Sequence, residues 1–345
     1  MLTLYNAFGV PDGVGALPRV RRDRRLRRPT RRPWALEYNR FAVKKGWHHN
    51  PSHRTQVEID IGAEKHYGFR PWKPIEGRSR SVKSRTNYAS DLTDRQWQLI
   101  CHWLPRKSHR ARKPICRRWI INAILYVTRT GCQWRMLPAD FPNWSTVYGI
   151  FWRWRNDGTW EKVHDALRAK VRRASGKKST PPAAIIDSQS IRTSEGGEER
   201  GYDAGKKITG RKRHLVVDTL GLVLAVVIHS ADWQDQDGAY WVIEKLREKF
   251  RRIKVIFGDS AYGRNNLPTW VNEAFGWVLQ TVLRPVGVKD FVVLPKRWIV
   301  ERTFAWLSRY RRNCKDYEKT TASGEAFTYI SMIALMSRRL ENTEK

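Results

Sequence analysis

Residues 211–231, RKRHLVVDTLGLVLAVVIHSA, constrain the fold of this chain most. Two runs rich in β-branched and other apolar residues flank positions 218–221, where Asp, Thr and Gly favour a turn. The best apolar run, at 220–228, is too short to span a bilayer. The pattern therefore predicts two strands of a sheet joined by a turn.

The segments around these two strands predict a mixed α/β fold. In chain order we expect strand, strand, strand, helix, strand, helix, strand, helix, at residues 183–190, 211–217, 222–231, 237–250, 254–262, 266–276, 277–283 and 297–312. A last amphipathic helix is expected at 323–340. Three strands with hairpin-type joins, followed by helix-linked strands, give a mixed sheet with helices on its faces. This order resembles the ribonuclease H-like fold, a likeness that by itself carries no function.

Four helices are predicted ahead of the sheet. Thr93 with Gln96 fits a capping box, Gly131 ends a second helix that starts near residue 114, and Ser145 can cap a third at 143–158. The second and third helices form a candidate helix-turn-helix pair, in which Tyr148, Trp152, Arg153 and Arg155 would face a DNA groove. A helical bundle with these aromatics in its core fits the sequence equally well.

These patterns divide the chain into three parts. We expect a basic, disordered extension at residues 1–88, a small all-α DNA-binding domain at 89–178, and a catalytic α/β domain at 179–345 with a C-terminal helix. The extension contains the like-charge block RVRRDRRLRRPTRR at 19–32. It is either a basic arm on DNA or an unselected extension of the reading frame.

The net charge indicates the kind of partner. The chain has 345 residues, with 66 Lys and Arg against 33 Asp and Glu, a formal charge of +33. Such a charge favours a polyanion, and nucleic acid is the first hypothesis. A basic structural protein and a membrane-surface binder are the alternatives. The 17 Trp residues argue against a simple basic structural protein, because they imply a packed core or a stacking surface.

The cysteines and the first residues indicate location. The four cysteines have no C-x-x-C spacing, so neither a disulfide framework nor a zinc site is predicted. No signal peptide is evident at the start. We therefore expect a cytoplasmic protein with no membrane partner.

Two aspartates and one glutamate are the candidate metal ligands. Asp187 follows the apolar run of the first strand and Asp259 follows that of the fourth, so the two carboxylates lie side by side if those strands are parallel neighbours. Such a pair needs a proton or a cation between its charges. Oxygen ligands suit Mg²⁺ or Mn²⁺, and two ions roughly 3.5–4 Å apart serve phosphoryl transfer. Glu301 is the candidate third ligand.

Helical geometry tests the assignment of Glu301, which lies in RWIVERTFAWLSRYRR at 297–312. At about 100° per residue, Arg297, Ser308 and Arg312 fall within about 40° of Glu301. The opposite face is apolar and can dock on the sheet; it holds Ile299, Thr303, Trp306, Leu307 and Tyr310. Without the two aspartates, Glu301 would be an ordinary exposed residue paired with Arg297.

The remaining charged residues have structural interpretations as well. Asp218 fits the turn, Asp235 and Asp237 fit the start of a helix, and Asp203 lies in a loop. His214 and His229 are interpreted as structural. The basic residues near the inferred site either position phosphates or belong to a solvated turn; they are Lys206, Lys207, Arg211, Lys212 and Arg213.

Several segments together resemble the DDE-type transposases of bacterial insertion sequences, in the IS-five group of the IS-four/IS-five superfamily. They are DSQS (187–190), GYDAGKKITGRKRHLVVDTLGL (201–222), HSADWQDQDGA (229–239), GDSAYG (258–263) and RWIVERTFAWLSRYRRNCKDYE (297–318). Residues 90–105 and 131–154 resemble that group's N-terminal portion, so the resemblance covers about 90–340.

The resemblance implies a function and a set of site residues. Asp187, Asp259 and Glu301 would be the DDE triad, and the substrate would be the terminal inverted repeats of the element. Water would cut the DNA, and the freed 3′-hydroxyl would attack target DNA. A DNA-bound homodimer or higher oligomer would pair two element ends.

The sequence departs from the superfamily pattern in the acidic helix. Arg297 and Glu301 fit the pattern Tyr-x-x-Arg-x-x-x-Glu, but Leu294 stands at the Tyr position. Ser308 stands where a Lys is expected, so Arg309 or Arg312 would take over its phosphate contact, with Arg302 beside them. The alternatives to a transposase are a nuclease or resolvase on the same fold, and an inactive DNA-binding repressor.

Overall fold

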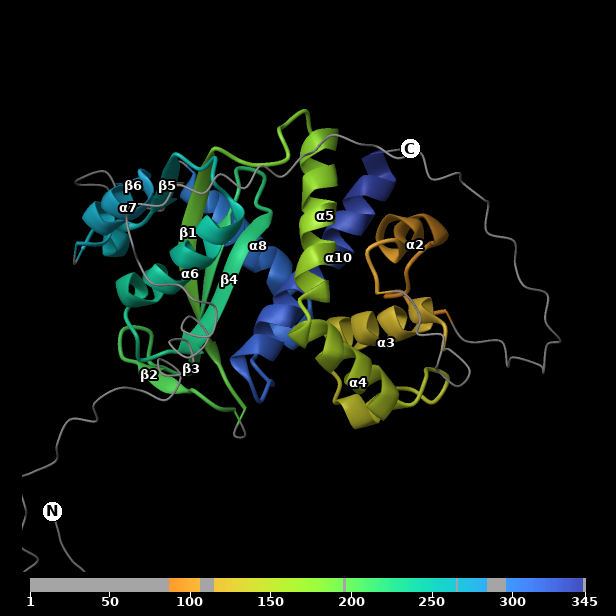
Figure 1. The fold of residues 1–345 in the computed structure, drawn as a ribbon. Helices are drawn as coiled ribbons and strands as arrows, with labels where there is room; N and C mark the ends of the chain where they lie inside the picture. The colour runs from red at the N-terminus through yellow and green to blue at the C-terminus, as the bar shows by residue number, and fades with distance from the viewer. Residues whose placement is uncertain (1–86, 106–114, 195–196, 265, 284–295, 344–345) are drawn as a thin grey trace, which may run out of the picture. The chain divides into compact units, whose positions relative to one another are not determined.

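The computed structural model of the chain describes residues 87–105, 115–194, 197–264, 266–283 and 296–343 (Figure 1). Nearly all of the extension expected at 1–88 lies outside these residues.

A mixed sheet of six strands forms the centre of the described fold. The strands are β1 (Ala183–Arg192), β2 (Gly201–Asp203), β3 (Ile208–Val217), β4 (Val223–Ser230), β5 (Val255–Gly258) and β6 (Val278–Thr281). β3 pairs antiparallel with β1, β2 and β4, whereas β1, β5 and β6 run parallel. Leaving β2 aside, the order is β4-β3-β1-β5-β6. This is the ribonuclease H-like arrangement that the order of the predicted elements indicates.

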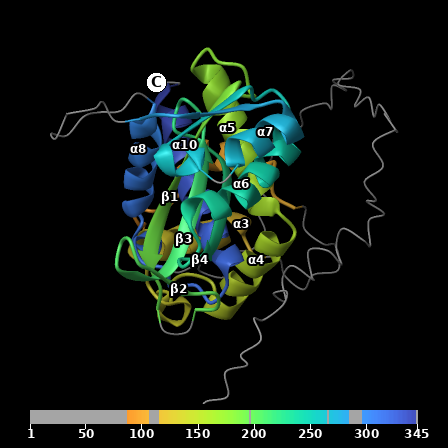
Figure 2. The ribbon, with the colours of Figure 1, turned by 90° about the vertical axis from the view of Figure 1, so that its left-hand side faces the viewer.

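Helices cover both faces of the sheet because its strands are apolar on both sides. Successive residues of a strand point to opposite faces. Val216 accordingly packs with α6 (Asp235–Lys249) and α7 (Leu267–Phe275), whereas Leu215 and Val217 pack with α8 (Arg297–Ser308). Figure 2 shows α6 and α7 on one side of the strands and α8 on the other.

The helices ahead of the sheet form where the sequence predicts them. They are α2 (Asp94–Cys101), α3 (Arg117–Thr130), the short η1 (Trp134–Met136), α4 (Trp144–Asn156) and α5 (Thr159–Ala174). Thr93 caps α2 by accepting from the Gln96 amide at 3.2 Å, and Gly131 ends α3 with φ +74°. The expected cap Ser145 is wrong: Asn143 caps α4 by accepting from the Ser145 amide, because α4 starts at Trp144, two residues earlier than a Ser145 cap requires.

The helix α10 (Thr321–Thr343) joins these helices to the sheet. Its Phe327 stacks on Phe151 of α4 with ring centroids 4.9 Å apart. On α5, Glu161 accepts a 2.7 Å hydrogen bond from the Tyr329 hydroxyl. Toward the sheet, Glu325 accepts from the Ile228 amide of β4 at 3.1 Å. One continuous core therefore includes residues from the N-terminal helices, α10 and the sheet.

Candidate metal and nucleic-acid site

The strand register brings Asp187 and Asp259 together. β1 and β5 are parallel neighbours in which Ile185 is opposite Phe257. Asp187 lies two residues after Ile185, and Asp259 lies two residues after Phe257. β5 ends at Gly258, so Asp259 directly follows it, and both carboxylates lie where the β1–β5 pairing ends, close enough for the charge of Asp259 to act on Asp187. The expected parallel pairing is thus confirmed.

Burial and charge make this position favourable for a cation. The pKa of Asp187 is raised from 3.8 to about 6, mainly by burial and also by the neighbouring charge of Asp259. Asp187 Oδ1 accepts from the Ser188 amide at 2.7 Å, and Asp259 Oδ1 accepts from the Ala261 amide at 2.9 Å. These backbone bonds orient both carboxylates.

Glu301 approaches the same region from α8. Its helix docks on the sheet through a buried stripe, Ile299, Val300, Thr303, Phe304 and Leu307. Trp306, which we expected on this face, is only partly buried. The Glu301 side chain is 53 % exposed and turns away from the stripe.

Arg297 lies between two of the acids. Its Nη2 is 3.8 Å from Glu301 Oε1 and 4.0 Å from Asp259 Oδ2. Its charge also lowers the pKa of Asp187 against the larger effect of burial. A guanidinium therefore provides the positive charge that these carboxylates require.

The donor set suits a hard divalent ion. The three side chains offer only carboxylate oxygens, which are ligands that Mg²⁺ and Mn²⁺ prefer. Within the described part of the chain, no group of three or more His, Cys, Asp or Glu side chains is arranged to hold a metal. Glu301 would therefore have to move closer to Asp187 and Asp259 for a three-carboxylate site to form.

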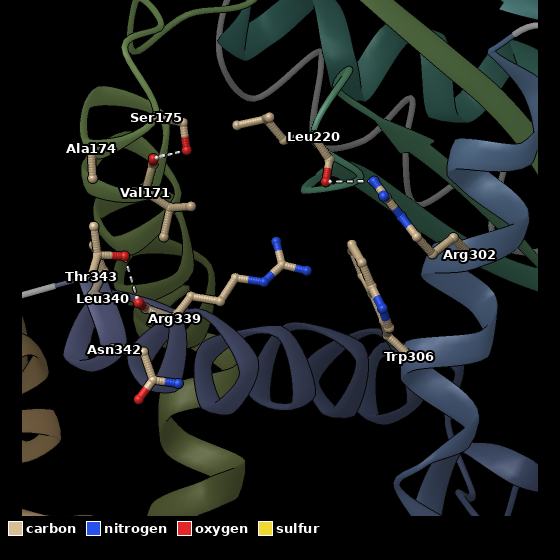
Figure 3. A pocket seen from close by; sticks show the side chains of 10 residues that line it. All are labelled: Val171, Ala174, Ser175, Leu220, Arg302, Trp306, Arg339, Leu340, Asn342 and Thr343. Carbon is tan, nitrogen blue, oxygen red and sulfur yellow. Dashed lines mark hydrogen bonds between the residues drawn. The ribbon is translucent and has the colours of Figure 1, made fainter. Parts of the chain in front are cut away.

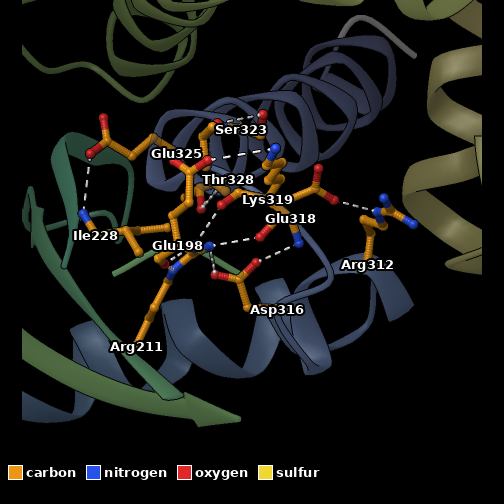
Figure 4. Close-up of polar contacts among 12 residues, drawn as sticks. Glu198, Arg211, Ile228, Arg312, Asp316, Glu318, Lys319, Ser323, Glu325 and Thr328 are labelled. Atoms are coloured by element: carbon orange, nitrogen blue, oxygen red, sulfur yellow. Dashed lines mark hydrogen bonds and ion pairs between the residues drawn. The ribbon is translucent and has the colours of Figure 1, made fainter. Parts of the chain in front are cut away.

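Arg211 is buried, which corrects the expectation that it contacts DNA (Figure 4). It pairs with Asp316 at 3.0 Å and donates to the backbone oxygens of Glu198, Glu318 and Lys319. The basic run 211–213 lies inside β3, between two neighbouring strands, rather than in a loop. Its side chains therefore point into the protein.

Lys212 and Arg312 are also buried with partners. Lys212 Nζ contacts Asp235 at 2.9 Å and donates to the Trp233 backbone oxygen at 2.7 Å. Arg312 Nε donates to Glu318 at 2.6 Å. Our helical projection of Arg312 is wrong because α8 ends at Ser308: Tyr310 is extended, and a separate helix α9 (Arg311–Cys314) follows.

The other basic candidates are accessible to different degrees. Arg153, Lys206, Lys207 and Arg309 are exposed. Arg155, Arg297 and Arg302 are half-buried, and Arg155 donates to Thr320 and Ser323 near α10. Ser308 and its neighbour Arg309 are exposed, whereas Arg312 is buried. Arg309 is therefore better placed than Arg312 to replace the Lys expected at position 308. Leu294 lies outside the described residues.

The sequence left open whether the aromatics of the helix pair α3 and α4 face DNA or form the core of a helical bundle, and α4 has aromatics in both positions. Val147, Phe151 and Trp154 are buried in the core. Tyr148 and Trp152 are 38 % and 48 % exposed, respectively, beside the exposed Arg153. One face of α4 is thus core, and the other is available to a partner.

A polar network on the other face of β1 is the feature that sequence reasoning missed. Ser188 Oγ donates to Asp235 at 2.7 Å, and Lys212 bridges Asp235 to Asp203, which is 3.7 Å from its Nζ. Asp235, expected to serve the helix start, therefore connects α6 to β1 and β3. Along β1, Ser188 and Ser190 lie on the opposite face from Asp187. This alternation of polar residues in the sequence was the signal from which the network could have been predicted.

Comparisons with known proteins agree with this fold. Residues 92–164 match the family model "Putative transposase of IS4/5 family", and residues 178–336 match "Transposase DDE domain". The "Insertion element IS402 uncharacterized 16.2 kDa protein" of Burkholderia cepacia is 34 % identical over 119 residues, which are 32 % of this chain and 78 % of that protein.

Two solved structures show weaker similarity. The Mos1 transposase paired-end complex with left transposon end has 11 % identity and a TM-score of 0.20, covering 50 % of this chain and 61 % of that chain. The pre-cleavage Mos1 transpososome has 10 % identity and a TM-score of 0.23, covering 69 % and 81 %. These scores are too low to support a functional inference.

The match over residues 178–336 places the sheet and its helices in the class of DDE transposase domains. The chain belongs to the insertion-element transposases of the IS4/5 family. None of its described helices is long and apolar enough to cross a membrane.

Proposed function

We propose that this transposase binds the terminal inverted repeats of its element, cuts double-stranded DNA there and joins the freed end to target DNA. The observation that carries the proposal is the register that sets Asp187 beside Asp259 at one end of two parallel strands. Catalysis would take place in the cytoplasm on nucleoid DNA. A homodimer or higher oligomer would hold two element ends.

Three carboxylates would act as metal ligands in this reaction. Asp187, Asp259 and Glu301 would hold two ions of Mg²⁺ or Mn²⁺. Bound ions would activate the attacking oxygen and stabilise the leaving one. The backbone bonds to Asp187 and Asp259 would keep their remaining oxygens directed at the ions. Arg297 would move from the acids to a DNA phosphate.

The two chemical steps use the same site. In the first, a water oxygen bonds to the scissile phosphorus, the bond from phosphorus to the 3′-oxygen breaks, and a 3′-hydroxyl and a 5′-phosphate result. In the second, that 3′-hydroxyl attacks a target phosphodiester, whose own 3′-oxygen leaves with a proton. Arg309, Lys206, Lys207 and Arg153 are accessible cations that would position DNA phosphates.

The test is cleavage and joining of labelled inverted-repeat DNA with a target plasmid and Mg²⁺. Glu301→Gln should lower both rates at least about 100-fold, because a charged ligand is lost at the reacting phosphate. Glu273→Gln is the matched control, since Glu273 is an exposed acid on α7. Undiminished rates in Glu301→Gln would refute its role.

The same assay separates the alternatives. Cleavage without joining by the unmodified chain would identify a nuclease or resolvase. Binding of the repeats without cleavage in Mg²⁺ or Mn²⁺ would identify an inactive DNA-binding repressor.

A further inference from the structure

A stripe of alternating Trp and Arg runs along α8 away from the acidic site. Trp298, Arg302 and Trp306 are four residues apart and so lie on one side of the helix. The Arg302 guanidinium carbon lies 4.5 Å from the Trp298 ring centroid and 4.6 Å from that of Trp306. Cation–π contacts hold such a guanidinium in place without neutralising its charge.

The helix α10 supplies a further arginine at the far end of the stripe. The Arg339 guanidinium carbon lies 4.2 Å from the Trp306 ring centroid. Figure 3 shows this side chain directed into a cavity between α5, α8 and α10. The cavity measures about 420 Å³ and is walled by Arg302, Trp306 and Arg339, together with the turn residue Leu220.

A second cavity adjoins the first. It measures about 300 Å³ and shares Trp306, Arg339 and Asn342 with the first. Together the two cavities are lined by five arginines, Arg129, Arg302, Arg309, Arg338 and Arg339, and by no Asp or Glu among the described residues. We call this region the Trp306 pocket.

None of the described residues that line the Trp306 pocket is an acid that could balance its positive charge. The acid whose charge reaches Arg302 and Arg339 is Asp218. Asp218 is buried, pairs with Arg172 and accepts from the Leu220 and Leu222 amides. Burial lowers the pKa of Arg339, and the charge of Arg302 lowers it further. Converging, partly buried cations of this kind are stabilised by an anion.

The chemistry of the lining selects a phosphate group. Guanidinium groups match phosphate oxygens with paired N–H donors, and stacking on Trp306 fixes the planes of two of them. Arg302 Nη2 donates to the Leu220 backbone oxygen at 3.1 Å, which fixes it further. A second copy of the chain is an unfavourable occupant, because its formal charge is also +33.

The dimensions suit a DNA strand. Trp298 and Trp306 are eight residues apart, about 12 Å along the helix axis. Phosphates of one DNA strand recur every 3.4 Å or so along the duplex axis, so the stripe spans about three to four of them. Its first member, Trp298, precedes Glu301 by one helical turn. A strand lying on the stripe would therefore lead from the acidic site to the Trp306 pocket.

We propose that the Trp306 pocket is a phosphate-binding site that takes backbone phosphates of the DNA strand leaving the acidic site. The proposal rests on the DNA-transposing function proposed above, and it adds Trp306, Arg338 and Arg339 to the DNA contacts. These residues bind DNA and do not contact the reacting phosphate.

The first experiment tests the anion site without DNA. Millimolar pyrophosphate should raise the melting temperature of the unmodified chain, and Arg339→Gln should lose most of that shift. Arg247→Gln is the matched control, because Arg247 also stands over a Trp ring, Trp277, at 5.8 Å on the opposite side of the sheet. An equal shift in all three proteins would overturn the site.

The second experiment tests whether the anion is DNA. Affinity for a labelled inverted-repeat duplex is measured between 50 and 300 mM salt, conditions chosen to resolve counterion release. Arg339→Gln should weaken binding about tenfold at low salt and reduce the log–log slope by about 0.9. Arg247→Gln should leave the slope unchanged. Arg338→Ala serves as the second variant if Arg339→Gln does not fold.

The outcomes separate this proposal from the proposed function. If the unmodified chain does not bind the duplex, the DNA-binding function fails. If it binds and cleaves, but Arg339→Gln and Arg338→Ala keep its salt slope, the Trp306 pocket is not a DNA contact. A lost pyrophosphate shift with an unchanged slope would identify a site for a free anion and would equally overturn the DNA assignment.

Discussion

At the residue scale, Arg211 shows that the position of a basic side chain in a strand decides its role. Every hydrogen-bonding nitrogen of its guanidinium has a partner, and its carboxylate partner Asp316 is buried too. Burying two charges is favourable only when both remain paired. A residue that composition assigns to DNA binding thus holds β3 to the segment that precedes α10.

Replacing Arg211 should therefore destabilise the fold strongly. Arg211→Met leaves the Asp316 carboxylate unpaired in the interior, which should lower the free energy of unfolding by about 3–5 kcal/mol. Lys206→Met is the control at an exposed position and should change it by less than about 0.5 kcal/mol. Urea unfolding measures both. Equal effects would mean that solvent replaces the Arg211 contacts.

A buried histidine pair predicts acid sensitivity. The rings of His214 and His229 are 4.8 Å apart and leave no room for a side chain at Gly238, where a Cβ would lie 2.4 Å from His229 Nε2. The pKa of His229 is lowered from 6.5 to about 4, mainly by burial and also by the charge of Lys212, against the Ser230 backbone hydrogen bond and the charges of Asp235 and Asp232. His229 is therefore neutral in the folded protein at neutral pH.

The sign of the pH dependence follows from this lowered pKa. Between pH 6.5 and 4 the unfolded chain binds the proton and the folded chain does not, so stability falls as pH falls. His229 should contribute a loss of about 3 kcal/mol between pH 7 and 4. Urea unfolding of His229→Gln should show a shallower pH dependence, whereas His102→Gln, at an exposed position, should keep the original one. An unchanged dependence in His229→Gln would contradict the assignment.

At the element scale, α10 protects the edge of the sheet. Among the described strands β4 pairs only with β3, so no strand covers the backbone groups of its other edge, which could otherwise bind another chain. Glu325 accepts from the Ile228 amide on this edge and also pairs with Lys245 of α6 at 2.8 Å. The Glu325 side chain thus accepts a hydrogen bond from the edge of β4 and connects α10 to α6.

Removing this carboxylate should loosen the edge. Glu325→Ala should lower the free energy of unfolding by about 1–3 kcal/mol, because the Ile228 amide loses its acceptor and Lys245 loses its carboxylate partner and keeps the Val226 backbone oxygen. Hydrogen exchange at the Ile228 amide should become faster. Glu273→Ala, at an exposed helix position, is the control for both measurements. Unchanged exchange would show that water or another group replaces Glu325.

The elements could be predicted where local signals determine them. The turn at Asp218 and Gly221 forms as expected, with Gly221 at φ +79° and its amide bonded to the Asp218 oxygen. β2 could not be predicted, because three residues, Gly201–Asp203, have no periodicity and extend only by pairing with β3. The end of α8 was missed for a similar reason, since no local sequence signal marks Tyr310, which is extended and buried.

At the scale of the whole molecule, the acids of the site were easier to predict than its cations. Asp187 and Asp259 follow from strand order, which fixes what lies at one end of a sheet. Basic residues are frequent everywhere in a chain of charge +33, so their presence says little about where DNA binds. Burial distinguishes Arg211, which lies inside the protein, from the exposed Arg309. The contact between α8 and α10 identifies Arg339 as a candidate DNA contact. Burial and this contact both depend on tertiary structure.

The central position of α10 has a consequence for synthesis. Phe151 of α4 gains its stacking partner Phe327 only when α10 has been made. Roughly 150 residues separate α5 from α10, and at 5–20 residues per second their synthesis takes about 7–30 s. During that interval the ribosome holds helices whose apolar faces are uncovered. Chaperones that bind exposed aromatic surface would therefore have a defined period in which to act on each nascent chain, before the last helix completes the core.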